Sequence, residues 1–449
     1  MHIEAVDISP IEAFLRLRSL PFPFIISGTR ARYSYVSARP FITVRTEDGS
    51  TFVEGEMEGK KRFDDPFAAL SHLLKSSAYT GGSPFPFSSG AAGYFSYDLN
   101  NLIEPKLKAK RAAGRGLGLP DCLLGLYDPV FVYDNAEGKG HLVSRRLDKA
   151  RFGGFKRALE ARSRRPSEPG PVSAMTSNFT REGYIAAIEK AKEYISSGDI
   201  YQINLSQRLG LKWEGDPFAI FLKMQDARPA PFSSYFDFGG FQIISNSPER
   251  LVKIEGGHIE TEPIKGTRPR GVTPEEDEAL REGLRMSAKE RAEHVMIVDL
   301  ERNDLGRISL PGTVNVNGFG EITTYPTLHH MASIVKGQLR PEIDTPQALK
   351  AVFPGGSVTG APKIRAMEII DELEPDRRGV YTGGIGWMDL NGDIDMAMAI
   401  RTAVYKDNTI YLHVGGGIVA DSVPADEYDE TLLKARDFLD ILKLGARAI

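Results

Sequence analysis

The chain has 449 residues, of which 41% are hydrophobic and 26% are charged, so it can bury a large core and form two or three domains. It contains no run of 18 uncharged apolar residues and no basic or apolar leader, so we expect a soluble, cytoplasmic protein with no membrane partner. A net charge of -4 argues against a nucleic-acid partner, and the single cysteine, Cys122, excludes an internal disulfide bond and a cysteine-based zinc site.

The first 165 residues have the pattern of an antiparallel sheet. Short β-prone runs occupy 23–28, 33–36, 41–44, 91–98 and 121–134, and residues 66–77 are predicted to form a short amphipathic helix. The apolar run around Cys122 indicates a buried structural thiol. Residues 161–174 have the composition of an exposed connector. We place the main boundary there, between an N-terminal region, 1–165, and a catalytic region, 175–449.

Helices and strands alternate more regularly after the connector. The predicted elements are a helix from Thr180 to Gly198, a strand at 200–211, strands at 241–246 and 251–254, a helix at 276–299, a helix at 363–373, a strand at 410–414 and a last helix that begins at Asp426. The strand at 200–211 places Gln202, Asn204 and Ser206 on one face, which either meets water or lines a site.

Lys265 lies at the centre of the stretch that we expect to organise this region. Gly266 frees the backbone for a turn, while Pro263 and Pro269 prevent a helix on either side. A lysine held in a rigid, half-buried turn loses its proton more easily than a solvated lysine, and a neutral amine is a nucleophile. The stretch alone favours a surface loop with a solvated lysine, because most lysines are solvated; the rest of the chain changes that balance.

Two pairs of glutamates have the spacing of side chains on one helical face. Glu290 and Glu293 form the first pair, and Glu427 and Glu430 form the second. Carboxylates of this kind are the hard oxygen ligands that Mg²⁺ prefers. Each pair by itself is also typical of a solvated acidic face.

Several other residue types are candidates for anion binding or proton transfer. Gly415, Gly416 and Gly417 follow a predicted strand and expose backbone N–H groups to an anion, or else form a bulge or turn. Arg401 lies in a predicted apolar strand and needs a carboxylate partner, from the protein or from a ligand. His330 can act as an acid or base near neutral pH, or it can be a packed histidine.

The glycine-rich stretch at 353–363 is not a Walker phosphate loop. In that motif a Lys-Ser or Lys-Thr pair follows the last glycine, whereas here Gly360 is followed by Ala-Pro. We therefore expect this stretch to cap the helix at 363–373.

Taken together, these segments resemble the chorismate-utilising enzymes, a family that includes anthranilate synthase component I, aminodeoxychorismate synthase component I and the isochorismate and salicylate synthases. The matching segments are 200–208, 247–250, 289–306, 353–375 and 415–422. The resemblance spans nearly all of 180–440 and is weaker in the N-terminal half, where 93–98 matches best. It implies an α/β (α+β) fold in which orthogonal antiparallel sheets from both halves of the chain, enclosed by helices, surround a site for Mg²⁺ and chorismate.

The resemblance also implies a role for each candidate residue. Glu293 and Glu430 resemble the principal Mg²⁺ ligands, with Glu290 and Glu427 nearby through water. Tyr381, Arg401 and the amides of Gly415, Gly416 and Gly417 resemble the groups that hold the substrate carboxylates, while Gly266 and Thr267 resemble contacts to the ring carboxylate. Glu249 matches the acid that protonates the departing C4 hydroxyl. His330 matches a histidine near the ring, although the run of His329 and His330 departs from the family pattern and leaves open which of them faces the substrate.

Two positions distinguish the members of this family. Gln202 stands where the water-using members carry a lysine base, so ammonia is the expected nucleophile. Lys265 lies in Pro-Ile-Lys-Gly-Thr, where anthranilate synthases have Pro-Ile-Ala-Gly-Thr, and this lysine resembles that of aminodeoxychorismate synthase component I. The implied reaction is covalent attack by Lys265 on chorismate and displacement by ammonia to give 4-amino-4-deoxychorismate, a precursor of 4-aminobenzoate and folate.

The chain lacks a glutaminase nucleophile, because no elbow glycines surround Cys122. Ammonia is therefore expected from a separate glutaminase subunit. The second interpretation is anthranilate synthase component I, which differs in releasing pyruvate. A catalytically silent regulator that binds chorismate or tryptophan is a third interpretation, against which the full set of site residues argues.

Overall fold

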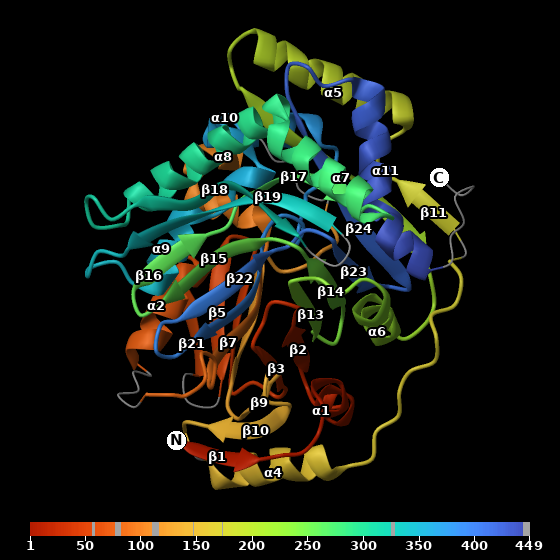
Figure 1. The fold of residues 1–449 in the computed structure, drawn as a ribbon. Helices are drawn as coiled ribbons and strands as arrows, with labels where there is room; N and C mark the ends of the chain where they lie inside the picture. The colour runs from red at the N-terminus through yellow and green to blue at the C-terminus, as the bar shows by residue number, and fades with distance from the viewer. Residues whose placement is uncertain are drawn as a thin grey trace.

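Two antiparallel sheets form the centre of the computed structural model, which describes residues 1–55, 59–76, 82–109, 116–146, 148–172, 174–324 and 328–442 (Figure 1). The first sheet consists, in spatial order, of β1 (His2–Ala5), β10 (Lys139–Ser144), β9 (Val130–Asp134), β3 (Tyr33–Ser37), β2 (Phe24–Ser27), β13 (Phe232–Asp237), β14 (Gln242–Ser247), β23 (Thr402–Lys406), β24 (Thr409–Ile418), β12 (Gln202–Lys212) and β11 (Ala174–Ser177), with β20 (Gly360–Ala361) paired to β12.

The second sheet likewise combines strands from both ends of the chain. Its spatial order is β17 (Ile264–Pro269), β19 (Leu328–Gln338), β16 (His258–Thr261), β15 (Arg250–Glu255), β22 (Ile394–Met398), β21 (Gly384–Asp389), β7 (Gly90–Phe95), β8 (Cys122–Tyr127), β4 (Ile42–Glu47), β5 (Ser50–Gly55) and β6 (Gly59–Phe63), with β18 (Asn315–Thr324) paired to β19. The first half of the chain is joined to the second where β2 pairs with β13 and where β7 pairs with β21.

Helices cover the outer faces of the sheets. They are α1 (Pro10–Leu17), α2 (Pro66–Ser76), α3 (Asn100–Ile103), α4 (Lys149–Glu160), α5 (Arg181–Ser196), α6 (Pro217–Ala227), α7 (Pro274–Met286), α8 (Ala288–Gly306), α9 (Thr345–Val352), α10 (Lys363–Leu373) and α11 (Pro424–Ile441), with 3-10 turns η1 (Tyr97–Leu99), η2 (Pro105–Ala109) and η3 (Gly356–Val358). Within the described ranges, none of these helices is long and apolar enough to cross a membrane.

An aromatic core fills the space between the two sheets. Tyr35 of the first sheet packs edge-on against Trp387 of the second, with ring centroids 5.7 Å apart, and Phe87 stacks on the same indole at 5.2 Å. All three side chains are buried, together with Phe24 and Tyr94. Burial of large rings supplies much of the hydrophobic free energy that holds two sheets face to face. The predicted fold class, antiparallel sheets enclosed by helices, is confirmed.

Most predicted elements are present, with three corrections. The helix predicted at 276–299 is two helices, because the backbone at Ser287 is extended (ψ 109°) and its hydroxyl accepts the Glu290 N–H of the next helix at 3.4 Å. The strand predicted at 410–414 continues to Ile418, so Gly415–Gly417 form part of β24. Arg401 lies between β22 and β23, with a φ of +48°, and not in a strand.

α5, α2, the connector and Cys122 were also predicted from the sequence. The helix after Thr180 is α5, and the Thr180 hydroxyl accepts the Gly183 N–H at 3.0 Å. The helix predicted at 66–77 is α2 as far as Ser76, and residue 77 lies outside the described residues. Residues 162–172 of the connector form neither helix nor strand, and Figure 1 shows them running along one side of the molecule from α4 to β11. Cys122 is buried and free, as predicted.

Candidate active site

A glycine bulge in β17 sets the position of Lys265. The pairing of β17 with β19 shifts register between Lys265 and Thr267, and Gly266 at the shift has a φ of +72°. A methyl group on Gly266 would lie 2.6 Å from Leu284 Cδ1 of α7 and 3.1 Å from Glu290 Oε2 of α8. Only glycine fits both this backbone and this space, so the strand passes directly beneath the two helices.

The Lys265 side chain reaches across from the second sheet to the first. A methyl group on Gly417 of β24 would lie 3.5 Å from Lys265 Nζ and 2.6 Å from Gln202 Nε2 of β12. Burial lowers the pKa of the Lys265 ammonium, against the opposing attraction of the Glu293 and Glu249 carboxylates. A larger fraction of this amine is therefore neutral than in an exposed lysine.

Glu249 is a buried carboxyl group close enough to Lys265 for the two charges to interact. It lies just before β15 and is 6% exposed. Burial raises its pKa to about 7, although the Ser357 hydroxyl donates to Oε1 at 2.6 Å and the Lys265 ammonium also favours the carboxylate. A carboxyl group with a pKa near neutrality can hold a proton and release it to a substrate at physiological pH.

The two glutamate pairs predicted from the sequence face the same region from two helices. Glu290 and Glu293 come from α8, while Glu427 and Glu430 come from α11. Burial raises the pKa of Glu293, and the negative charges of Glu290 and Glu427 raise it further. Burial likewise raises the pKa of Glu427, against a 2.7 Å hydrogen bond from the Ser422 hydroxyl. The structure therefore gathers carboxylates whose mutual repulsion a bound cation would relieve.

Lys434 is a charged residue of this cluster that the sequence did not single out. Its Nζ lies 2.7 Å from Glu430 and donates to the Gly415 carbonyl at 2.9 Å. Burial of Glu430 is outweighed by this ammonium, which lowers the pKa of the carboxyl. In the described part of the chain, no group of three His, Cys, Asp or Glu side chains is already arranged around a metal position. The carboxylates gather from two helices without forming a closed cage.

Gly415, Gly416 and Gly417 bring the β24 backbone close to this cluster. A methyl group on Gly416 would lie 3.4 Å from Glu427 Oε2 and 3.9 Å from Glu430 Oε1. A methyl group on Gly415 would lie 2.8 Å from the Tyr381 hydroxyl. These glycines pair with β12, whereas β23 pairs with β24 only as far as Leu412. β23 therefore does not pair with Gly415–Gly417, and the Gly415 carbonyl accepts a hydrogen bond from Lys434.

Tyr381 is held rigidly beside Gly415. Its ring stacks on His413 with centroids 5.2 Å apart, and burial raises its pKa to about 12. The hydroxyl is therefore a neutral hydrogen-bond donor at any physiological pH.

Arg401 and the two histidines occupy distinct positions. Arg401 pairs with Asp437 of α11 at 2.6 Å and remains 33% exposed. His329 contacts Asp277 of α7 at 2.9 Å, whereas His330 contacts the Thr267 hydroxyl at 2.8 Å from the opposite face of β19. Burial and the Arg401 charge lower the pKa of His330 to about 4. His330 is therefore a neutral imidazole near pH 7.

The sequence also did not identify the residues that form hydrogen bonds to the site residues and to the strands and loop that carry them. Ser357 holds Glu249, and it lies in the glycine-rich loop that we had expected only to cap a helix. The buried Arg378 donates to the Asn204 carbonyl at 2.6 Å and to the Val358 carbonyl at 2.9 Å, and it pairs with Glu374 at 2.7 Å. This pair lies after the end of α10 at Leu373, so no helical spacing signalled it in the sequence.

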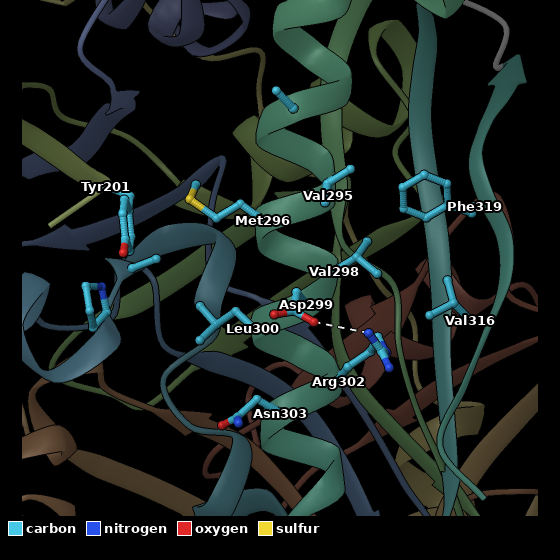
Figure 2. Close-up of a pocket in the computed structure, with 13 residues that line it drawn as sticks. Tyr201, Val295, Met296, Val298, Asp299, Leu300, Arg302, Asn303, Val316 and Phe319 are labelled. Atoms are coloured by element: carbon cyan, nitrogen blue, oxygen red, sulfur yellow. Dashed lines mark hydrogen bonds and ion pairs between the residues drawn. The ribbon is translucent and has the colours of Figure 1, made fainter. Parts of the chain in front are cut away.

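A separate cavity of about 580 Å³ lies beside α8 (Figure 2). Its lining is mostly apolar and includes Tyr201, Val295, Met296 and Phe319. The Asp299–Arg302 ion pair, at 3.1 Å, lies beside these residues. Neither Lys265 nor Glu249 lines this cavity.

The comparisons with known proteins agree with this geometry. A family model described as chorismate binding enzyme matches residues 22–440. The chain is 37% identical to anthranilate synthase component 1 of Pseudomonas aeruginosa, over 98% of this chain and 94% of that protein. It is 40% identical to aminodeoxychorismate synthase component 1 of Bacillus subtilis, over 91% of this chain and 89% of that protein. Its fold matches anthranilate synthase component I from Streptococcus pneumoniae TIGR4 with a TM-score of 0.82 and 33% identity, covering 98% and 99% of the two chains.

Proposed function

Because this chain belongs to the family of chorismate binding enzymes, we propose that it is an aminodeoxychorismate synthase component I. In this proposal it converts chorismate and ammonia to 4-amino-4-deoxychorismate. The observation that carries the proposal is the amine of Lys265, with a lowered pKa, between Glu249 and the backbone of Gly417. Relatives of two activities match at similar identity, so the choice between them depends on this lysine.

In the first step the neutral amine of Lys265 is the nucleophile. A bond forms from Nζ to C2 of the ring, both ring double bonds shift by one position, and the C4–O bond breaks. Glu249 donates its proton to the departing oxygen, which leaves as water. A pKa of about 7 suits this role, because half of the acid is still protonated near neutral pH.

In the second step ammonia forms a bond to C4 and displaces the lysine. The double bonds shift back, the bond between Nζ and C2 breaks, and Lys265 leaves as the amine. Two such displacements place the amino group where the hydroxyl was, and pyruvate is retained. Covalent catalysis divides one difficult displacement into two easier ones.

The remaining side chains are proposed to bind and orient the substrate. Tyr381 and the backbone of Gly415–Gly417 would donate hydrogen bonds to a carboxylate. Arg401 is partly exposed and would bind a second substrate carboxylate with its guanidinium, either keeping or breaking its ion pair with Asp437. His330 and Thr267 form one hydrogen-bonded unit on the bulged strand, so the neutral imidazole orients the hydroxyl rather than exchanging a proton.

The carboxylates of α8 and α11 fit a divalent cation of the Mg²⁺ type. The fit rests on oxygen donors whose charges raise the pKa of Glu293, a sign of repulsion within the cluster. Glu293 and Glu430 would hold the ion, with Glu290 and Glu427 through water, and Mg²⁺ commonly needs only one or two carboxylates besides water and substrate. When bound, the ion would neutralise the ring carboxylate and so reduce its repulsion of an incoming nucleophile.

Product analysis tests the proposal. The purified chain is incubated with chorismate, Mg²⁺ and an ammonium salt at mildly alkaline pH. We expect a product that a 4-amino-4-deoxychorismate lyase converts to 4-aminobenzoate. Anthranilate with stoichiometric pyruvate would instead support the second candidate, anthranilate synthase component I, and would refute the role given to Lys265.

A further inference from the structure

Arg401 lies where the chain crosses from the second sheet to the first. β22 ends at Met398 in the second sheet, and β23 begins at Thr402 in the first. Between them Arg401 has a φ of +48°, a conformation that non-glycine residues rarely adopt, and its carbonyl accepts the Asn246 N–H at 3.0 Å. The backbone at this crossing is therefore constrained, and the position of the Arg401 guanidinium depends on its side-chain contacts.

The Arg401 guanidinium is held at one corner. Its NH1 donates to Asp437 Oδ2 at 2.6 Å, and in the described part of the chain it forms no second hydrogen bond or ion pair. A guanidinium carries five N–H donors in a planar fork, and two of them can bind the two oxygens of one carboxylate. The contact with Asp437 therefore leaves N–H groups of Arg401 for a second carboxylate.

Asp437 belongs to the helix that also carries glutamates of the site. This helix, α11, packs against β24 (Figure 1). Four charged side chains that are spaced by three or four residues follow one another along it, namely Glu427, Glu430, Lys434 and Asp437. One helix thus presents both the carboxylates that are proposed to hold the cation and the carboxylate that holds Arg401.

A second arginine limits how far Asp437 cancels the charge of Arg401. Arg228, at the end of α6, lies 3.7 Å from Asp437 through Nε and 3.8 Å from Asp440 through NH2. Asp437 therefore lies between two guanidinium groups, so that two positive charges face one negative charge. Asp440 is 50% exposed, and water screens its charge more strongly. An anionic substrate thus still meets positive charge at Arg401.

We propose that Asp437 is a positioning residue, which orients Arg401 for a carboxylate of the substrate through an ion pair that persists when the substrate binds. This inference rests on the proposed function, which gives Arg401 the role of binding such a carboxylate. A long side chain that is already held in its binding conformation loses less conformational freedom when the substrate binds. Asp437 therefore acts through Arg401 on the affinity for the substrate and not on the chemical step.

The opposite role for Asp437 predicts an effect of opposite sign. If Asp437 occupied the position of the substrate carboxylate, its removal would free Arg401 and tighten the binding of chorismate. In the positioning role, its removal lets the guanidinium adopt several conformations and weakens binding. The direction of the change in affinity therefore distinguishes the two roles.

Steady-state kinetics with chorismate, Mg²⁺ and an ammonium salt measure the effect on the reaction. Asp437→Asn removes the charge with little change in shape, and it is expected to raise the KM for chorismate ~5-fold or more while kcat stays within about twofold. Asp437→Glu keeps a carboxylate and is expected to give a smaller rise in KM. Asp440→Asn is the matched control, because Asp440 lies on the same helix and its ion pair is with Arg228. Its KM is expected to stay within about twofold of that of the unsubstituted chain.

Binding measurements without turnover test whether Asp437 acts through Arg401. Isothermal titration of chorismate with Mg²⁺ and without ammonia, into chains that carry Lys265→Ala, gives a Kd because the proposed nucleophile is absent. Asp437→Asn is expected to raise this Kd ~5-fold or more where Arg401 is present. In an Arg401→Ala background the same substitution is expected to change the Kd by less than about twofold, since the group that Asp437 orients is gone.

Three results would overturn the proposal. The first is an unchanged Kd in Asp437→Asn. The second is a lower Kd, which would make Asp437 a competitor of the substrate carboxylate. The third is an equal rise in Kd with and without Arg401, because the substitution would then act by another route, such as a displaced α11. If the unsubstituted chain forms no 4-amino-4-deoxychorismate from ammonium, the proposed function fails, and the Kd comparison still decides the role of Asp437 separately.

Discussion

Removal of the Ser357 hydroxyl is expected to move the pH dependence of catalysis in a defined direction. Ser357 donates to Glu249 Oε1 at 2.6 Å and so stabilises the carboxylate form of a buried acid. In Ser357→Ala this stabilisation is lost, and the pKa of Glu249 should rise above its present value of about 7.

The size of the shift follows from the strength of such a bond. A hydrogen bond to a charged group contributes about 1.5 to 3 kcal/mol, and one pKa unit corresponds to about 1.4 kcal/mol, so the shift should be about 1 to 2 units. In the proposed mechanism Glu249 acts as an acid, so the rate is expected to fall as the pH rises through its pKa. The alkaline limb of the kcat profile should therefore move upward by about 1 to 2 pH units.

The assay follows 4-amino-4-deoxychorismate formation at saturating chorismate from about pH 6 to about pH 10. The concentration of free ammonia is held constant, so that ionisation of the nucleophile does not enter the profile. Ser357→Thr keeps the hydroxyl and is expected to keep the original limb. An unchanged limb in Ser357→Ala would refute the reasoning, since Glu249 would then not be the group that titrates.

Three other perturbations test the same site. Lys265→Ala should lower the rate of amination by ~10³-fold or more, and a normal rate would refute covalent catalysis. Without ammonia, mass spectrometry is expected to find an adduct of chorismate minus water on the unsubstituted chain, and Lys265→Ala should abolish this adduct. The pKa of Glu249 rises from 4.5 to about 7 on folding. The contribution of this group to the free energy of unfolding is therefore fully present below about pH 4.5, and up to about 3 kcal/mol of it is lost as the pH rises through about 7. Glu249→Gln should remove that loss, so denaturant unfolding at about pH 5 and about pH 8 should give a smaller difference in the free energy of unfolding than in the unsubstituted chain. The same difference in both proteins would contradict this prediction. Chelation of divalent cations should abolish turnover, and added Mg²⁺ should restore it. Glu430→Gln should need ~10-fold more Mg²⁺ for the same recovery, and an equal Mg²⁺ requirement in the variant and the unsubstituted chain would contradict the assignment of Glu430 as a ligand.

The sequence predicted the parts of the site that depend on local pattern. The i, i+3 spacing placed Glu290 with Glu293 and Glu427 with Glu430 on helical faces, as α8 and α11 have them. Pro263, Gly266 and Pro269 marked the irregular backbone around Lys265, and the structure shows a bulge there. These signals are readable because each depends on residues within one turn or one strand.

The rest could not be predicted because it depends on contacts between distant segments. Ser357 reaches Glu249 across 108 positions of sequence, and no local pattern pairs a loop hydroxyl with a carboxyl group so far away. The break between α7 and α8 was missed, although Ser287 and Glu290 have the Ser-x-x-Glu spacing of a helix N-terminus, because such a pattern also occurs within helices. The partner of Arg401 was left open, and Asp437 supplies it from a helix 36 residues later.

The interleaved sheets have a consequence for how the chain is made on the ribosome. The edge of β7 pairs with β21, and roughly 290 residues separate Phe95 from Gly384. At ~5–20 residues per second, that strand edge waits for its partner for about 15 to 60 s. An open edge is a template for wrong pairing throughout that time. Nascent chains of this protein should therefore depend on chaperones until nearly all of the polypeptide has emerged.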